Sequence, residues 1–545
     1  MQTNLTITCV MASIVGCGDA ASDMAASGPG GGESTWPGMD AGSGTTGPSG
    51  GDDDGSAAPP PPENELDFDL RTPEAGDRYL FVPSASLDAL IAVDGRDLRV
   101  HLVEVGLTPT IVRALPDHGG AAVLNEGSSD VTLVRYDPDA PDTRFVADTF
   151  PVAAGANRLE LSPDGAWAFA WHDARVAGPG PSGLAATLQD VTALRLLPGE
   201  EAVFNLAVGY QPTAVQFADD DRLALVACDN GVSVVDLSTL AGDLFVPPIP
   251  TTGDVFTSML EREIVPAPDG RFVVVRDLQY AELLWIDLET RVRHRLALPD
   301  FPSDLDLTAD GERLLVPLKA RAEVAVIEVP EAFLWQGEPD PDTLIMPDNP
   351  HVRYVASGGA FGSLALTSGA ERALLYTTQA GSPAVGLLDL AAGAVTLLPL
   401  VKEVEGIAVD PTGAVAALQL RKSSGTGAIR GQEAYALLDL ASGYIKVVAT
   451  TSPASMFTFT RDGAELFALL PDPAGARHEV HRVTTETFST RTYAVPDAPT
   501  FVGAMPQVSK MAISLDNPTG WITFVDTETD EVRQLNSFEL NGFVR

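Results

Sequence analysis

Short runs of apolar residues alternate with turn-forming residues along most of the chain. The clearest example is residues 161–170, where an apolar strand end is followed by Ser162-Pro163-Asp164-Gly165 and a second apolar run. Asp-Gly between two apolar runs is a strong hairpin signal, because glycine readily takes positive φ and the aspartate accepts backbone N–H groups. The pattern therefore predicts a strand, a tight turn and a second strand. Degraded copies follow at residues 265–274, 307–316, 409–413 and 459–463.

A second regularity follows these copies, namely a strand that ends in aspartate and a small turn. It occurs at residues 231–239, 283–290, 385–390, 434–440 and 521–527. One unit is then a strand, an Asp-Gly turn, a strand, a loop, a strand ending in aspartate, a short turn and a fourth strand. The units recur at roughly 40 to 60 residues, near the period of four-stranded propeller blades.

This unit resembles the repeat of bacterial β-propellers of the WD40-like and YVTN-like kind, over about residues 75 to 545. The resemblance implies an all-β propeller of four-stranded blades, about seven to ten of them, in a domain over residues 70–545. After the first unit, further units begin near Thr110, Arg158, Pro212, Arg262, Ser303, Gly359, Glu405, Ala454 and Thr500. Common propellers have roughly four to eight blades, so insertions, a large ring and two rings all remain open. We expect one continuous propeller domain.

The first unit is expected to be incomplete. Residues 78–83, 89–94 and 99–105 predict three strands, which leaves this blade without its first strand. We expect the end of the chain, residues 542–545, to supply that strand and close the ring, because an open ring leaves exposed strand edges.

Long insertions are expected at one end of the ring. Residues 172–190, 421–433 and 472–478 fall between the second and third strands of their units, and residues 240–261 fall between units. In a propeller these connections lie on the same face, and loops on a rigid scaffold commonly carry function. Neutral drift is the alternative explanation. Residues 331–349 are also long but have no predicted place.

The start of the chain has a different pattern. A short apolar stretch, residues 5–15, ends at Gly16-Cys17 and resembles a bacterial lipobox. The resemblance implies a signal peptide over residues 1–16, cleavage after Gly16 and a lipid on Cys17, which would anchor an exported protein to the cell envelope, with the outer membrane expected. The alternative is a chance cysteine in an apolar tail. The lack of Lys or Arg before Cys17 favours that alternative, unless the true start lies upstream.

Residues 17–69 are rich in Gly, Ser, Ala, Asp and Pro and contain no Lys or Arg. Such a segment buries too little apolar area to offset its ordering entropy, so we expect a disordered tether with a span on the order of 40 Å. No apolar run of the chain is long enough to span a bilayer.

The net charge limits the partners that we expect, and the cysteine content limits the disulfides. A net charge of −41 repels polyphosphates, so nucleic acid is not expected to bind. Cys9 would leave with the signal peptide, Cys17 would carry the lipid, and Cys228 lies in an apolar run typical of a small buried residue. We therefore expect no disulfide in the mature chain.

No catalytic, metal or cofactor site is predicted. The aspartates that end the third strands are better explained as turn caps than as a catalytic ring. They are Asp236, Asp287, Asp389, Asp439 and Asp526. Residues 47–51 match the G-x-S-x-G pattern of serine hydrolases, but they lie in the tether with no strand before them.

Two further clusters carry side chains of the kind that bind metal ions. His478 and His481 are three apart in an expected strand or loop, where they would face opposite ways, whereas zinc proteases place two histidines four apart on a helix. The acidic stretches 137–142 and 338–342 lack the spacing and central glycine of an EF-hand calcium loop. We expect solvated acidic loops.

Two functions of different classes follow from this reasoning. The first is a lipid-anchored binding or scaffold module that uses the face with the long insertions to bind a protein or a glycan. The alternative is a propeller enzyme, either a lactonase-like hydrolase or a quinoprotein-type dehydrogenase. His, Arg or carboxylate side chains converging on the central funnel would favour the enzyme. We expect binding.

Overall fold

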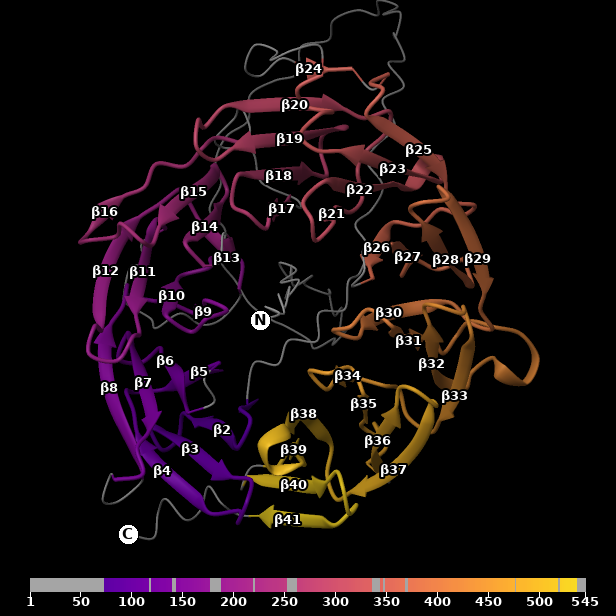
Figure 1. Ribbon diagram of the computed structural model, residues 1–545. Helices are drawn as coiled ribbons and strands as arrows, with labels where there is room; N and C mark the ends of the chain where they lie inside the picture. The colour runs from indigo at the N-terminus through magenta and orange to yellow at the C-terminus, as the bar shows by residue number, and fades with distance from the viewer. Residues whose placement is uncertain are drawn as a thin grey trace, which may run out of the picture.

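The computed structural model describes residues 73–116, 119–139, 144–176, 188–218, 221–251, 262–335, 344–346, 348–367, 371–475, 477–517 and 520–536. These residues form ten β-sheets that stand side by side around one axis, with the first strand of each innermost (Figure 1). The only helices among them are short 3-10 turns, η1 (Lys319–Arg321), η2 (Gly427–Ile429) and η3 (Pro506–Val508). The protein is a ten-bladed β-propeller, which lies within the seven to ten blades that the repeat predicts.

The strands of blades 1 to 5, from the axis outward, are as follows. Blade 1 has β1 (Glu74–Ala75), β2 (Tyr79–Ser84), β3 (Ala89–Asp94) and β4 (Val100–Glu104); blade 2 has β5 (Pro109–Ala114), β6 (Gly120–Asn125), β7 (Asp130–Tyr136) and β8 (Phe145–Pro151). Blade 3 has β9 (Arg158–Leu161), β10 (Trp167–Trp171), β11 (Asp190–Arg195), β12 (Ala202–Ala207) and then β16 (Leu244–Phe245). Blade 4 has β13 (Pro212–Ala218), β14 (Leu223–Cys228) and β15 (Gly231–Asp236); blade 5 has β17 (Arg262–Pro266), β18 (Phe272–Asp277), β19 (Glu282–Asp287), β20 (Arg293–Ala297) and then β24 (Leu344–Ile345).

Blades 6 to 10 each have four strands. Blade 6 has β21 (Asp306–Leu307), β22 (Arg313–Leu318), β23 (Glu323–Glu328) and β25 (Val352–Ala356); blade 7 has β26 (Ser363–Leu366), β27 (Arg372–Tyr376), β28 (Ala384–Asp389) and β29 (Ala394–Pro399). Blade 8 has β30 (Val404–Val409), β31 (Val415–Leu420), β32 (Glu433–Asp439) and β33 (Ile445–Thr450); blade 9 has β34 (Met456–Phe459), β35 (Glu465–Leu470), β36 (His478–Thr484) and β37 (Ser489–Val495). Blade 10 has β38 (Pro499–Met505), β39 (Lys510–Leu515), β40 (Trp521–Asp526) and β41 (Val532–Asn536).

The turns between first and second strands confirm the Asp-Gly prediction. In five blades the turn glycine has a φ between 66° and 72°, and its N–H donates to the carbonyl three residues earlier over 2.8–2.9 Å. Only glycine takes this left-handed conformation without strain. In blade 4 the position belongs to Asp221, with a φ of 64°. The glycines are Gly165, Gly270, Gly311, Gly413 and Gly463.

The aspartates at the ends of third strands cap the following turns, as predicted. Each carboxylate accepts a backbone N–H from two or three residues later, over 2.6–3.0 Å. This local role accounts for all five positions, from Asp236 to Asp526.

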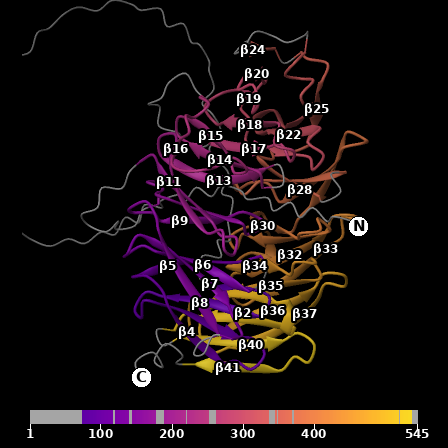
Figure 2. The ribbon, with the colours of Figure 1, turned by 60° about the vertical axis from the view of Figure 1, so that its left-hand side comes forward.

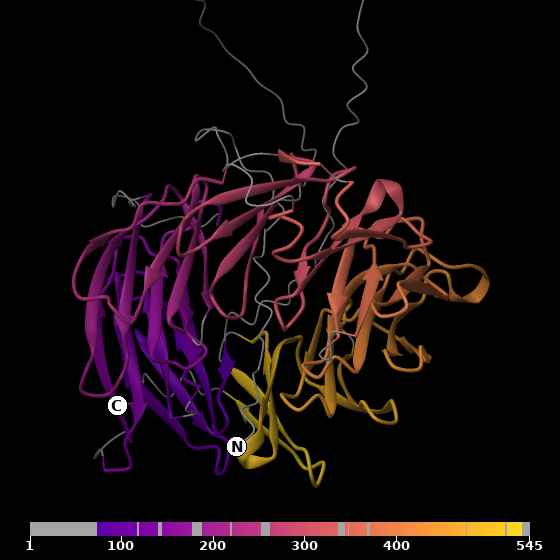
Figure 3. The same ribbon diagram turned by 45° about the horizontal axis from the view of Figure 1, so that its top comes forward.

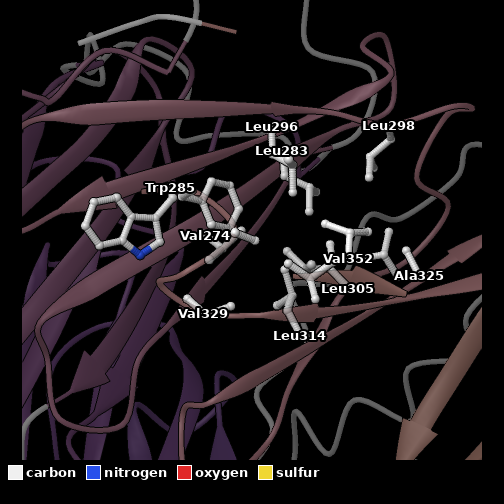
Figure 4. Close-up of a cluster of buried hydrophobic side chains, with 14 of the residues drawn as sticks. Val274, Leu283, Trp285, Leu296, Leu298, Leu305, Leu314, Ala325, Val329 and Val352 are labelled. Carbon is white, nitrogen blue, oxygen red and sulfur yellow. The ribbon is translucent and has the colours of Figure 1, made fainter. Parts of the chain in front are cut away.

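The core is divided into ten clusters of buried apolar side chains among the described residues, and each cluster joins two neighbouring blades. Figure 4 shows the cluster between blades 5 and 6, where Val274 and Trp285 lie near Leu314 and Val329. Successive strand residues point to opposite faces, and both faces of a blade are covered. Second strands such as β6 and β18 are consequently buried along their whole length.

The first blade is complete without the end of the chain, so the expected closing strand was wrong. β1 supplies the inner strand, with Glu74 opposite Phe81 and Ala75 opposite Leu80. A strand of two residues, one of them charged, has no apolar run by which a pattern could detect it. Residues 542–545 lie outside the described residues.

Apolar packing closes the ring between blade 10 and blade 1. Leu80 and Ile91 share a cluster with Phe501, Met505 and Phe524 from blade 10. The views from other directions also place the first blade, in indigo, beside the last, in yellow (Figures 2 and 3). The seam is therefore built like the other nine interfaces.

Two segments leave their own blade and lie along the outer edge of the preceding one. After β15 the chain pairs as β16, in parallel, with β12 of blade 3, and it then returns to form a bridge between Val232 and Ile249. After β23 the chain pairs as β24 with β20 of blade 5 before it returns as β25. The placement of residues 240–261 on one face was thus partly wrong, and residues 331–349 now have a place, between β23 and β25.

Candidate functional site

The loops between second and third strands and the connections between blades lie at one end of the ring, because neighbouring strands are antiparallel. We call this end the long-loop face. As predicted, residues 172–189, 421–432 and 471–477 connect second to third strands. The opposite end carries the tight Asp-Gly and Asp-capped turns.

Loop 421–432 is held by a buried lysine. The ammonium group of Lys402, in the connection before blade 8, donates to the carbonyls of Arg421 (3.2 Å), Lys422 (2.8 Å) and Ser424 (3.2 Å). Lys402 is fully buried, and burial lowers its pKa. A buried ammonium is stable only when its donors are used, so these three hydrogen bonds fix the base of the loop.

Ion pairs brace the long-loop face across blades 3 to 5. Arg158 contacts Asp173 at 3.4 Å, and Arg175, from the same loop, pairs with Asp229 of blade 4. Arg262 of blade 5 donates to the carbonyl of Asp229 at 2.9 Å and contacts Asp277 at 3.5 Å. Burial lowers the pKa of Arg262. Among the described residues, these ion pairs and hydrogen bonds therefore link the bases of the loops of blades 3, 4 and 5 to one another.

A groove of about 500 Å³ lies on the outer rim between blades 2 and 3. Its walls are the end of β8, the start of β11, and β12 with β16. All these strand ends point toward the long-loop face, so the groove adjoins it. We call it the rim groove.

Three charged side chains gather on neighbouring inner strands. Glu74 of β1, Arg113 of β5 and Glu160 of β9 interact electrostatically, and Arg113 Nη2 lies 3.9 Å from Glu160 Oε2. Among the described residues, the buried Oε2 of Glu74 has no hydrogen-bond partner. Burial raises the pKa of Glu74 to about 7, against the opposing effect of Arg113. Sequence reasoning missed this cluster because β1 itself was missed.

The predicted separation of the two histidines is confirmed. Both lie in β36, where the Nδ1 atom of His478 is 2.9 Å from the N–H of Asp472 and that of His481 is 3.1 Å from the Tyr435 hydroxyl. Burial lowers the pKa of His481. The described residues contain no group of three His, Cys, Asp or Glu side chains placed to hold a metal ion.

Cys228 is a buried free thiol in the core between blades 3 and 4, as expected, and burial raises its pKa to about 12. Gly16, Cys17, residues 47–51 and the acidic stretch 338–342 lie outside the described residues, as does part of 137–142. In the part of the chain that the structure covers, no helix has the length and apolar character needed to cross a membrane.

No protein-family model matches the chain, and no curated protein matches it. Solved structures similar to it include a eukaryotic initiation factor (11% identity, 76% of this chain and 94% of that chain, TM-score 0.45). They also include the dihydro-heme d1 dehydrogenase NirN in complex with DHE (16% identity, 70% and 74%, TM-score 0.41) and the β-propeller domain of Myceliophteria thermophila Cps50 (Swd1) (12% identity, 60% and 97%, TM-score 0.32). With TM-scores below 0.5, these similarities assign no function to the chain.

Proposed function

We propose that this propeller is a binding module that uses its long-loop face to hold a protein or glycan ligand. A closed ring of ten apolar interfaces gives the loops a rigid base. Binding sites are commonly carried by loops on such scaffolds.

The observation that carries the proposal is the Lys402 clamp. Neutral drift lengthens a loop without ordering it, whereas loop 421–432 is fixed by three hydrogen bonds from a buried ammonium. Its tip remains exposed at Thr426, Ala428 and Arg430. A preorganised, exposed loop loses little entropy on binding, which favours affinity.

Site-specific photo-crosslinking tests the proposal. A benzophenone amino acid replaces Thr426 on the long-loop face or, as the matched control, exposed Thr487 on the opposite face. In the native cell, position 426 is expected to give a discrete crosslinked product and position 487 none. Equal products from both faces, or none from 426, would refute the long-loop face as the binding surface.

We also propose that residues 17–69 tether the ring to the cell envelope through a lipid on Cys17. The support is the Gly16-Cys17 lipobox followed by a segment of low apolar content. The denatured mass of the protein from its own membranes is expected to correspond to a chain that begins at Cys17 plus acyl groups. A chain that begins at Met1 without acyl mass would overturn the anchor.

The alternative, a propeller enzyme, is favoured by one observation. Glu74, Arg113 and Glu160 converge from three inner strands, and a carboxyl group with a pKa of about 7 is suited to general acid–base chemistry. A native mass that exceeds the denatured mass by an organic cofactor, and that falls to the bare chain in Glu74→Gln, would support the enzyme. Equal native and denatured masses would favour the binding module over the enzyme.

A further inference from the structure

One wall of the rim groove is formed by residues 243–246, a segment that we call the strap and that is firmly attached to blade 3. Asp243 accepts hydrogen bonds from the backbone N–H (2.9 Å) and side-chain amide (3.2 Å) of Asn205, and the N–H of Val246 donates to Ala207 at 2.8 Å. The groove wall is therefore a fixed surface.

The side chains on this fixed strap are nevertheless exposed. Leu244 is 49% exposed and Phe245 is 64% exposed, although they pair with Leu206 and Ala207 along the backbone. Together with Pro151 they give the groove an apolar wall. Exposed aromatic residues beside a groove are typical anchors for a partner.

One carboxylate in the groove has no partner of its own. Asp243 is occupied by Asn205, whereas the side chain of Asp190, which is half-buried at the start of β11, makes no hydrogen bond or ion pair with any described residue. A carboxylate beside an apolar surface recognises a ligand with a cationic group next to an apolar one.

An extended peptide is the form of ligand that suits this groove. Its side chains point alternately to opposite sides. A peptide that lies over β12 can therefore direct every second side chain toward Asp190 of β11 and the others toward Leu244 and Phe245.

The net charge of the chain indicates which kind of partner can bind in the rim groove. A second copy of a chain with net charge −41 would be repelled, while a basic segment would be attracted. We propose that the rim groove binds an extended segment of a partner protein in which Lys or Arg alternates with apolar residues, with the basic side chain on Asp190. This inference rests on the proposed binding function and names the partner chemistry for one part of it.

The test is the fluorescence anisotropy of labelled peptides with the full chain at physiological ionic strength. One peptide alternates Val with Lys, and its counterpart has Glu in place of Lys. The Lys peptide is expected to bind at least about tenfold more tightly, since a charge-assisted hydrogen bond is lost in the counterpart. Asp190→Asn and Phe245→Ser are each expected to weaken its binding by about tenfold.

Two variants control for general electrostatic and apolar attraction. Asp148→Asn removes a charge from the exposed outer strand of blade 2, and Met346→Ser changes an exposed apolar residue after β24. Both are expected to change affinity by less than about twofold, because neither residue lines the groove and because screening weakens charge effects beyond roughly 8 Å. Equal losses in Asp190→Asn and Asp148→Asn, or equal binding of both peptides, would overturn the proposal.

The end of the chain is a competing occupant, because Phe543-Val544-Arg545 has similar chemistry. A chain lacking residues 537–545 is expected to bind the Lys peptide as the full chain does, and a tenfold gain would assign the groove to that end instead. If the peptides fail to bind while position 426 still gives its crosslink, the groove assignment fails and the proposed function stands.

Discussion

At the scale of single residues, the carboxyl group of Glu74 lies in surroundings that differ strongly from water. Its carboxyl Oε2 is buried without a hydrogen-bond partner among the described residues, between the inner strands of blades 10 and 2. The charged side chains near it are Arg113, which lowers its pKa, and Glu160, which raises it. Burial has the largest effect, and the pKa rises from 4.5 to about 7.

This shift predicts how stability changes with pH. The folded pKa is higher than the unfolded one, so the folded state holds this proton more tightly, and stability falls as pH rises from about 4.5 to 7. Glu74→Gln mimics the protonated form and should melt higher than the natural chain, by roughly 1–2 °C more at pH 8 than at pH 5.5. Thermal melting at both pH values measures this.

Exposed Glu371→Gln is the control for the change of net charge. It should shift the melting temperature equally at both pH values. If Glu74→Gln also gives the same shift at pH 5.5 and pH 8, the carboxyl group is not perturbed by burial.

At the scale of elements, one turn geometry recurs in different surroundings. The glycines of the Asp-Gly turns in blades 3 and 6 both have a φ of 72°, but a Cβ at Gly165 would lie 2.6 Å from the Cδ of Pro116. A Cβ at Gly311 would meet only the Cδ of Pro268, at 3.4 Å. A comparison of alanine variants at the two sites therefore separates the cost of backbone strain from the cost of steric overlap.

Alanine at these two positions should give different losses. Gly311→Ala carries mainly the cost of a left-handed residue, about 1 kcal/mol. Gly165→Ala adds the overlap with Pro116 and should lose about 2 kcal/mol or more. Urea denaturation measures both free energies of unfolding, and equal losses would mean that the Pro116 ring moves aside freely.

The loop on the Lys402 clamp gives a second prediction at this scale. Lys402→Met removes the ammonium and leaves three carbonyls without their donor, which should cost about 1–3 kcal/mol and loosen loop 421–432. Trypsin should then cut after Lys422 or Arg430 about tenfold faster, as followed by mass spectrometry. Lys510→Met on β39 is the control, and unchanged cleavage in Lys402→Met would show that the clamp does not order the loop.

The elements that could be predicted from the sequence are those with a local cause. Asp-Gly turns such as Asp164-Gly165 and caps such as Asp287 depend on neighbouring residues alone. The rest depends on distant contacts: β1 is held by β2, β16 by a different blade, and Lys402 is paired with carbonyls about twenty residues away. The candidate sites are built from these distant contacts, so the fold was more predictable than its sites.

At the scale of the whole molecule, closure determines whether ten blades behave as one body. Met505 lies in the cluster between blades 10 and 1, and Met511 lies in the cluster between blades 9 and 10. Both side chains are fully buried. They form a matched pair, one at the seam and one at an ordinary interface.

If the seam is an interface like the others, Met505→Ala and Met511→Ala should each destabilise the ring by about 2–5 kcal/mol, through lost burial and the cavity left behind. Removal of residues 537–545 should leave the melting temperature unchanged, because blade 1 has its own inner strand in β1. Thermal and urea unfolding of the three variants show whether the ring is closed by apolar packing or by the end of the chain. A small loss in Met505→Ala together with a large loss on truncation would mean that the end of the chain closes the ring. The reverse result, with both methionine variants unfolding in one cooperative step, would mean that apolar packing alone holds ten blades in a closed circle.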